Sequence, residues 1–510
     1  MSSSHGVHKD SDDLKRPANQ GRIKGAAMQL ACEGHPQIVS VTPGMQFVQN
    51  RPSVRPEPVL SPGSDADGIG TIIYGAVIRD GGLFRMWYQA VPADWDGTED
   101  SACVGCVESD DGLVWRRPNY GLREVCGSKN NHLTDLPFHC PSVFIDPGAP
   151  DSMRYRAFGW AKPKPDAYRN ITQRGYFTAH SADGIHWQLD PDKPLYEGHD
   201  VITATWHPYT NDALVMMKRL QWVGGLPRRT FRTSRWTRES VTQPVIALVP
   251  DEFDDVVAVS RGFHSADYYG AGLLPTPGVT VGFLWHFRHT LPLSAGVSQY
   301  GVYGRIDVSL IYQLGHRGKW LHLPGRTDWL CGPEMPPWAR HGIHTADYPI
   351  EVGDQTWFYV TGAWHRHGAY LDTSWKPDPK RTAMLQKKGI GSIGVVTWPT
   401  NRLLGFEAPL AETIELSPTE VIGPGDMGKS SSLVLNVTTE QDGGVRVALT
   451  DAGGAPLRGY AVEDCDPIIG EHSAAKVTWK GNWEIPDQPI RAKVEITRGT
   501  IWAFDFREVS

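Results

Sequence analysis

The sequence predicts an all-β protein, a five-bladed β-propeller followed by a C-terminal β-sandwich. One observation is a hairpin phrase in which a strand is followed by an Asp-Gly turn and a Trp, as in Ser-Ala-Asp-Gly-Ile-His-Trp at 181–187. The phrase also occurs at 109–115 and, in a degenerate form, at 312–320. A hairpin that recurs about every 50 to 80 residues is typical of radially repeated sheets. The other observation is an abundance of turn formers, 54 Gly and 39 Pro, without a long window of helical periodicity.

Taken in order, the chain divides into units of about four strands each. The best defined strand is Leu83-Phe-Arg-Met-Trp-Tyr-Gln89, which alternates in the strand manner after the turn at 80–82. We expect five units, near residues 68–115, 139–187, 200–236, 267–320 and 344–398.

The two ends of the chain differ from these units. Residues 1–34 are polar and predict a disordered or loosely packed arm. Residues 35–410 would form the catalytic propeller. Short alternating strands with Gly turns predict a β-sandwich over residues 411–510.

Composition excludes several classes of function. The net charge of −7 and the lack of a Lys/Arg cluster argue against a nucleic-acid partner. No apolar run approaches the ~20 residues that span a bilayer, so no membrane partner is expected. The N-terminus lacks the apolar core of a secretory signal, which favours a cytoplasmic location. The seven Cys are scattered, and Cys103 and Cys106 would point to opposite faces of a strand, so we expect reduced thiols.

Several phrases resemble a known group of proteins. They are Phe84-Arg-Met-Trp-Tyr88, Gly-Ser-x-Asn-Asn at 127–131, Pro-Ser-Val-Phe at 141–144 and the hairpin at 181–187. With five units and a C-terminal sandwich, the chain resembles the five-bladed propeller glycoside hydrolases of families 32, 43 and 68. It is most similar to uncharacterised family-32-like bacterial proteins, along nearly its whole length after the arm. The resemblance implies a glycosidase, although one fold hosts many chemistries.

The chain also departs from these families. Family 32 carries Arg-Asp-Pro in its second blade, whereas Asp146-Pro147 here follows Ile145. Family 43 often has Asp directly before Pro-Ser, where this chain has Cys140. The acid and base assignments of these families therefore do not transfer as a set.

Glycosidic cleavage needs a protonated carboxyl group and a second carboxylate across the anomeric carbon. In a propeller the first residues of each innermost strand point at the axial funnel. Asp67, Asp200 and Asp267 stand before or at such strands, and we expect all three to be catalytic. They should converge on one pocket, and at least one should have a raised pKa. The structural alternative makes them turn or capping residues.

Further polar residues fit a sugar site. A His pair spaced by one residue shares a face of a strand, but no third ligand is evident, so we expect neither metal nor cofactor. The expected substrate-binding residues are His139, Arg219, Glu334, Asp347, His365 and His367.

The sequence therefore favours a glycoside hydrolase or transglycosidase that acts on a small glycoside. A non-catalytic carbohydrate-binding or scaffold propeller is the alternative, which the missing family motifs favour. A sialidase is less consistent, because it needs an Arg cluster for a carboxylate and usually six blades. No feature of the sequence specifies an oligomeric state.

Overall fold

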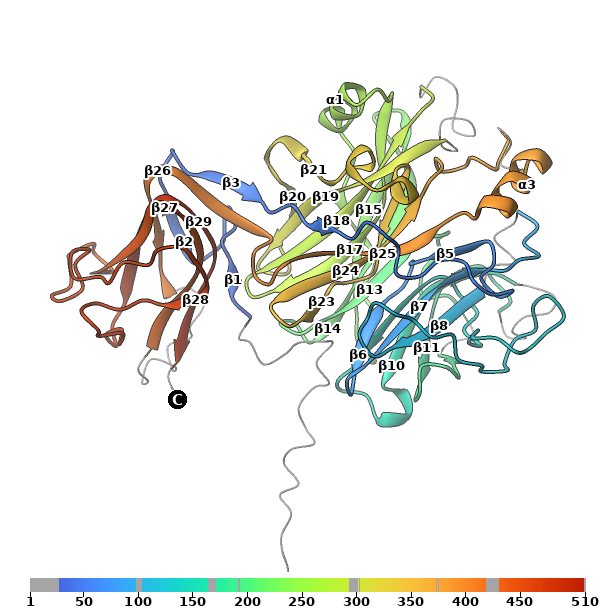
Figure 1. The fold of residues 1–510 in the computed structure, drawn as a ribbon, viewed down its shortest axis with the longest axis horizontal. Coiled ribbons are helices and arrows are strands. Elements are labelled where there is room, and N and C mark those ends of the chain that lie inside the picture. The colour runs from blue at the N-terminus through green and yellow to red at the C-terminus, as the bar shows by residue number, and fades with distance from the viewer. Residues whose placement is uncertain are drawn as a thin grey trace, which may run out of the picture.

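The computed structural model describes residues 27–97, 103–163, 171–190, 193–292, 301, 303–372, 374, 376–418 and 431–508. Over these residues the fold is all-β, with its strands in five sheets (Figure 1). The longer helices are α1 (Glu252–Ser260) and α3 (Pro379–Lys388). None of the described helices has the length and apolar content needed to cross a bilayer.

Three of the sheets are four-stranded and antiparallel, and each contains one predicted unit. Their strand orders are β5-β7-β6 with β8 beside β7, β12-β11-β10-β9, and β13-β14-β15-β16. The strands are β5 (Gly70–Ile72), β6 (Val77–Asp80), β7 (Leu83–Val91), β8 (Cys103–Ser109), β9 (His139–Ile145), β10 (Tyr155–Ala161), β11 (Gly175–Ser181), β12 (Gln188–Leu189), β13 (Ile202–His207), β14 (Asp212–Val223), β15 (Leu226–Trp236) and β16 (Val245–Leu248).

The fourth and fifth predicted units are joined in one ten-stranded sheet. The link is a parallel pairing of Ile306 with Gly342. At its far edge the last long strand pairs with residues from near the N-terminus, Val396 opposite Val54. The strands are β17 (Ser265–Thr276), β18 (Val279–His289), β19 (Gly304–Leu314), β20 (Trp320–His322), β21 (Asp328–Leu330), β22 (Gly342–Thr345), β23 (Ile350–Val352), β24 (Gln355–Ala363), β25 (Ser392–Pro399) and β4 (Ser53–Val54).

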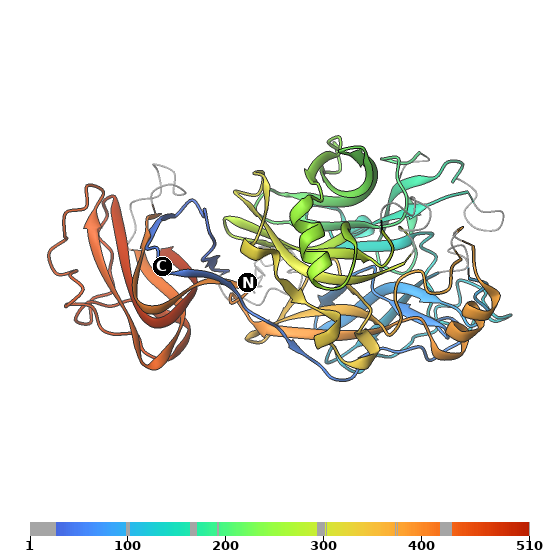
Figure 2. The ribbon, with the colours of Figure 1, turned by 90° about the horizontal axis from the view of Figure 1, so that it is seen from above.

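The remaining sheet lies at one end of the molecule, apart from the other four (Figure 2). Its path is β2-β26-β29-β27-β28, with β1 beside β29 and β3 beside β26. The strands are β1 (Gln29–Leu30), β2 (Ile38–Val41), β3 (Gln46–Gln49), β26 (Leu404–Leu416), β27 (Ser431–Asp451), β28 (Glu471–Lys476) and β29 (Ile490–Glu508).

This pairing corrects the predicted domain boundaries. Residues 38–49 were assigned to the propeller, but β2 and β3 pair with β26 of the C-terminal sheet. β26 itself begins before the predicted boundary at 410/411. Within the predicted arm, residues 1–26 lie outside the described residues, whereas Gln29 and Leu30 pair with β29. The reason is the short segment Met28–Cys32, whose apolar side chains are buried.

The repeated hairpin phrase forms the same local structure twice. Asp183 Oδ1 accepts hydrogen bonds from the backbone N–H groups of Ile185 (2.8 Å) and His186 (2.9 Å), and Gly184 has a φ of +77°. Asp111 makes the matching bonds to residues 113 and 114. The predicted structural role of both turns is therefore consistent with their bonding.

These hairpins also join neighbouring sheets. Trp87 of β7 donates its indole N–H to the carbonyl of Gly184, at 2.7 Å. Tyr359 of β24 donates its hydroxyl to the carbonyl of Gly112, at 2.8 Å. A Cβ on Gly184 would lie 2.6 Å from the Trp87 ring, so the turn needs glycine for close approach as well as for its dihedral angles.

Candidate functional site

A pocket of about 1220 Å³ opens where several sheets meet. Its wall includes the segment before β13, the later part of β14, the start of β15 and the start of β17. β13 and β14 are antiparallel, with Ile202 opposite Met217, so the beginning of one lies beside the end of the other. Three of the predicted site residues line this pocket: Asp200, Arg219 and His367.

Asp200 is the centre of the polar contacts in the pocket. Its Oδ2 atom accepts hydrogen bonds from the Lys218 ammonium and from the Tyr269 hydroxyl, the latter at 3.1 Å. Its Oδ1 atom lies 3.3 Å from His139 Nε2. Burial alone would raise the pKa of Asp200, but the charge of Lys218 and the His139 contact outweigh it and hold the pKa well below the usual range. Asp200 is therefore an ionised carboxylate at neutral pH.

The backbone around Asp200 is held in unusual conformations. Asp200 has a φ of +71°, and Cys140, whose Sγ lies 3.6 Å from Asp200 Oδ1, has a φ of +53°. The pairing of β9 with β10 slips by one residue, because Trp160 faces His139 while Phe158 faces Ser142. Such bulges re-aim side chains, and strained residues cluster at functional sites. Both features occur here at Asp200, which lines the pocket, or at residues next to it.

Aromatic and imidazole side chains surround the carboxylate. The Tyr269 hydroxyl lies 3.0 Å from His367 Nε2, and the Lys218 ammonium lies 3.3 Å from the centre of the Tyr269 ring. Tyr74 lies 3.2 Å from His344 Nε2 through its hydroxyl. Burial, and then the nearby His367, lower the pKa of His344 to about 3, so His344 is neutral. These residues come from four of the five units of the sequence, and His139 adds the remaining one.

Several of these residues were missed by sequence reasoning. Lys218, His344 and Tyr74 carry no motif. The one usable signal was the register of the β13–β14 hairpin. Because this hairpin turns at 208–211, residues 218 and 219 lie opposite the residues just before β13, and so near Asp200. Tyr269 was visible only as a neighbour of Asp267.

Asp67 does not share the Asp200 pocket wall. It is fully buried and accepts hydrogen bonds from the Arg117 guanidinium (2.8 Å), the Tyr88 hydroxyl (2.7 Å) and the Ser64 hydroxyl (2.7 Å). Burial opposes ionisation, but the Arg117 and His132 charges and these bonds lower its pKa. These contacts fit the structural alternative that the sequence left open, and Asp67 is not among the residues that line the pocket.

Asp267 lies in another closed cluster. It is fully buried, with Arg228 Nε at 2.8 Å, Arg229 at 3.3 Å and His289 at 3.1 Å. Burial alone would raise its pKa, but His289 and the two arginine charges lower it to about 2. The predicted convergence of three aspartates is therefore not what the contacts show, and the expectation of a raised pKa among the three is wrong.

The carboxyl group with a raised pKa is Asp347 instead. Burial raises its pKa well above the usual range, although the Val143 N–H donates to its Oδ2 at 3.2 Å. Its backbone N–H donates to the carbonyl of Gly75, between β5 and β6 of another sheet, and its carbonyl accepts from Leu273 in β17 of the ten-stranded sheet. Asp347 is therefore a buried, neutral junction between sheets, and it is not among the residues that line the pocket.

The other predicted binding residues separate in the same way. Glu334 is exposed and pairs with Arg51. His365 is held by the backbone carbonyls of Arg366 (2.9 Å) and Ile390 (3.1 Å). Neither lines the pocket, whereas His139 reaches it through Asp200.

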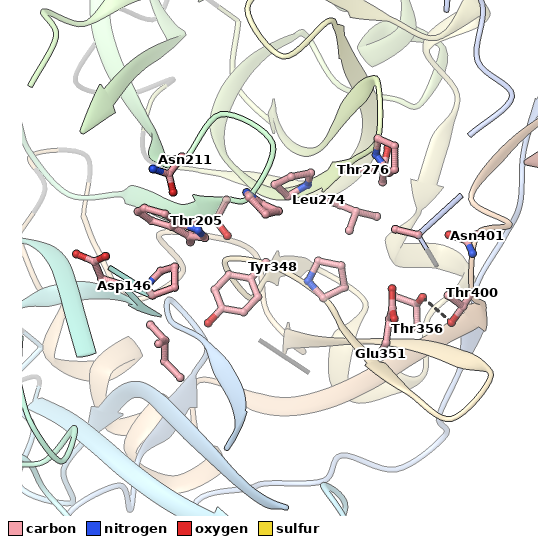
Figure 3. Close-up of a pocket in the computed structure, with 18 of the residues that line it drawn as sticks. Asp146, Thr205, Asn211, Leu274, Thr276, Tyr348, Glu351, Thr356, Thr400 and Asn401 are labelled. Carbon is pink, nitrogen blue, oxygen red and sulfur yellow. Dashed lines mark hydrogen bonds between the residues drawn. The ribbon is translucent and has the colours of Figure 1, made fainter. Parts of the chain in front are cut away.

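A second cavity, of about 950 Å³, lies at the opposite ends of β9, β13 and β17 (Figure 3). Tyr348, Thr205 and Asn211 surround it, together with Thr356 and Thr400, whose hydroxyls lie 3.2 Å apart. Its lining includes three acidic residues, Asp146, Asp151 and Glu351, and Asp146 is 3.3 Å from Arg238. This cavity lacks the concentration of titratable side chains found around Asp200.

Comparisons with known proteins give partial likenesses. No family model matches the chain. An uncharacterised protein of Mycobacterium tuberculosis (strain CDC 1551 / Oshkosh) is 30% identical over 138 residues, which cover 27% of this chain and 39% of that protein. An exo-inulinase from Aspergillus awamori is similar in structure over 89% of this chain and 99% of its own, at 10% identity and a TM-score of 0.36. An endo-arabinase from Bacteroides thetaiotaomicron is similar over 61% of this chain and 95% of its own, at 8% identity and a TM-score of 0.38.

Proposed function

We propose that this chain is a glycosidase, a hydrolase or transglycosidase, that binds a small glycoside in the pocket around Asp200. In this proposal the predicted units are five blades around one axis, with two of them in the ten-stranded sheet, and the C-terminal sheet folds as a sandwich. The observation that carries the proposal is an ionised carboxylate, only 8% exposed, at the wall of a pocket large enough for several sugar rings.

Asp200 has the properties of a base or nucleophile. Lys218 and Tyr269 fix one of its oxygens, and the Lys218 charge keeps the carboxylate ionised without protonating it. A carboxylate with these properties can accept a proton from water or attack an anomeric carbon, and it stabilises the positive charge that develops there.

The proton donor in this proposal is Glu197. It is the other carboxylate among the described residues that line the pocket. Its side chain is 89% exposed and lies 3.8 Å from the Arg219 guanidinium. Tyr370 also lines the pocket and offers a ring for a sugar to pack against.

A non-catalytic carbohydrate-binding protein is the second candidate. Asp67 and Asp267, two of the three predicted catalytic residues, are bound by arginines and do not themselves line the pocket. This observation favours binding without chemistry, because a glycosidase needs two carboxylates that flank one bond.

An assay on a panel of aryl glycosides separates the two candidates. The wild type is compared with Asp200→Asn, and Asp110→Asn is the matched control, since Asp110 is an exposed aspartate that pairs with Arg116 far from the pocket. The proposal predicts turnover by the wild type and by the control, and a loss of about 10³-fold in Asp200→Asn. Sugar binding without turnover of any glycoside by the wild type would establish the second candidate.

A further inference from the structure

Three different ligand atoms face one another around Asp200, which lines the pocket. They belong to His139, Cys140 and Asp200, and all three atoms lie within 4.8 Å of one another. Asp200 Oδ1 lies 3.3 Å from His139 Nε2 and 3.6 Å from Cys140 Sγ. With usual zinc bond lengths, the edges of a tetrahedral site are about 3.4 Å from N to O and about 3.6 Å from S to O. Both measured edges therefore match a tetrahedral zinc site before any ion is bound.

The backbone that holds these atoms together adopts unfavourable dihedral angles. Cys140 and Asp200 both have positive φ, which is unusual for residues other than glycine. The bulge in β9 falls on the same stretch, between His139 and Ser142. Strained backbone persists only where the surrounding structure holds it, and it clusters at active sites and ligand clamps.

Two other clusters of potential ligands, in the part of the chain that the structure describes, contrast with this one. In the cluster of Asp307, Asp328 and Cys331, the Arg288 guanidinium contacts both carboxylates. In the cluster of Asp254, His286 and His322, the Arg326 guanidinium lies 2.9 Å from Asp254. A guanidinium cannot lose its charge, so it opposes a second cation at both places.

At the pocket the competing cation is placed differently. Lys218 contacts Asp200 Oδ2, while Oδ1 is the oxygen that faces His139 and Cys140. A carboxylate can bridge a metal ion and an ammonium through its two oxygens. Two anionic ligands, the carboxylate and a thiolate, would balance the charge of a divalent ion.

We propose that His139 Nε2, the Cys140 thiolate and Asp200 Oδ1 bind Zn²⁺ at the wall of the pocket. The thiol proton passes to solvent on binding, and one tetrahedral position is left for water. This inference does not require the proposed function. If the protein is a glycosidase, Zn²⁺ and the sugar compete for the same oxygen of Asp200, so saturating Zn²⁺ inhibits turnover.

Titration of the full chain with Co²⁺, without sugar, tests the site directly. Tetrahedral Co²⁺ bound by a thiolate shows a near-ultraviolet charge-transfer absorption, and Zn²⁺ abolishes it by displacement. We expect one equivalent to produce this absorption, and Cys140→Ser to lose it. His139→Gln keeps the thiol and should weaken Zn²⁺ binding by more than about tenfold, since even a lost outer-shell partner costs 10- to 100-fold.

Two further variants make the result specific. Cys331→Ser is the matched control, because Cys331 is the thiol of the other cluster, and this variant should keep the absorption. Lys218→Met removes the competing charge and should tighten binding, whereas a structural role of the cluster predicts no such gain. Circular dichroism checks that each variant is folded. No charge-transfer band in the folded wild type, or an equal band in Cys140→Ser, would overturn the proposal and leave ordinary hydrogen bonds only.

Discussion

Asp200 and Asp267 are both buried aspartates that open neighbouring units, yet their surroundings differ. Both are ionised, since contacts lower the pKa of each. Two arginines and His289 enclose Asp267, which has no exposed surface. Lys218 and Tyr269 contact one oxygen of Asp200, His139 and Cys140 contact the other, and Asp200 itself lines a pocket. We therefore take the guanidinium network as structural and the carboxylate at the pocket as the candidate for chemistry.

The Asp267 cluster has a mechanical role that the Asp200 cluster lacks. Arg228 bonds to Asp267 and also to Asp255 of helix α1, at 2.9 and 3.1 Å. The same guanidinium donates to the carbonyl of Ala266, at 2.6 Å. One buried arginine thus ties β15, β17 and α1 together. Loss of its partner Asp267 should therefore lower the stability of the fold more than it lowers the activity.

The largest expected effect is the loss of stability in Asp267→Asn. Breaking a buried ion pair leaves its partner charge uncompensated and costs about 3–5 kcal/mol. Because Asp255 still pairs with Arg228, we expect a loss near 3 kcal/mol in the free energy of unfolding. Urea unfolding measures it, and the exposed pair variant Asp110→Asn should lose much less stability, because solvent screens the Asp110–Arg116 pair. Equal losses in the two variants would contradict the structural role of the cluster.

The next effect concerns Glu197→Gln. If Glu197 protonates the leaving group, its loss should slow cleavage by about 10²-fold or more for glycosides with a poor leaving group. Aryl glycosides with a very acidic phenol need little protonation and should be cleaved nearly normally. Rates across a leaving-group series measure this. A uniform loss across the series would instead assign Glu197 to substrate binding.

A smaller effect, a gain in stability, is expected for Asp347→Asn. The raised pKa means that the folded state favours the protonated carboxyl group, so the stability from proton binding is full below the unfolded pKa of about 3.9 and is lost as pH rises through the folded pKa. Asparagine does not ionise and can still accept from Val143. We expect it to stabilise the protein at pH 7 by about 1 kcal/mol.

The pH dependence is the control for Asp347. The advantage of Asp347→Asn should vanish at about pH 3 and below, under the unfolded pKa of about 3.9, where the wild-type carboxyl group is mostly protonated in both states. Melting temperatures at about pH 3 and pH 7 measure it. A variant that is less stable than wild type at pH 7 would show that an ionised Asp347 is needed.

The smallest effect is expected for Asp183→Ala. This change removes the acceptor of the two backbone N–H groups at 185 and 186, which costs about 1 kcal/mol for a half-exposed turn. Turnover per folded molecule should stay at the wild-type value, because the hairpin meets Trp87 and not the pocket. Lost turnover with an unchanged melting temperature would show that the turn serves the site.

The sequence predicted the β-rich class and the units, because the Asp-Gly hairpin is a local structure whose residues are neighbours in the chain. The partners of the three aspartates are not local. Arg117 comes 50 residues after Asp67, and Arg228 comes 39 residues before Asp267. Each of these pairs joins two separate segments of the chain. No turn signal in the sequence specifies such a side-chain contact. The same sequence cue therefore selected one pocket residue and two structural ones.

The N-terminal strands were missed for a related reason. Gln29 and Leu30 pair with residues 503 and 504, and β3 pairs with β26 more than 350 residues later. Two- and four-residue strands have too little periodicity to be recognised alone. Only the buried segment Met28–Cys32 carried a signal, and it is short.

The central claim, that the chemistry belongs to Asp200 and that Asp267 is structural, is tested most directly by a paired measurement. Asp200→Asn and Asp267→Asn are assayed side by side for turnover per folded molecule and for melting temperature. The account predicts that Asp200→Asn loses about 10³-fold in turnover. It should lose less stability than Asp267→Asn, because the Lys218 ammonium lines the pocket and can be hydrated there. Asp267→Asn should show the reverse pattern. Near-normal turnover in folded Asp200→Asn, on a glycoside that the wild type cleaves, would contradict the account.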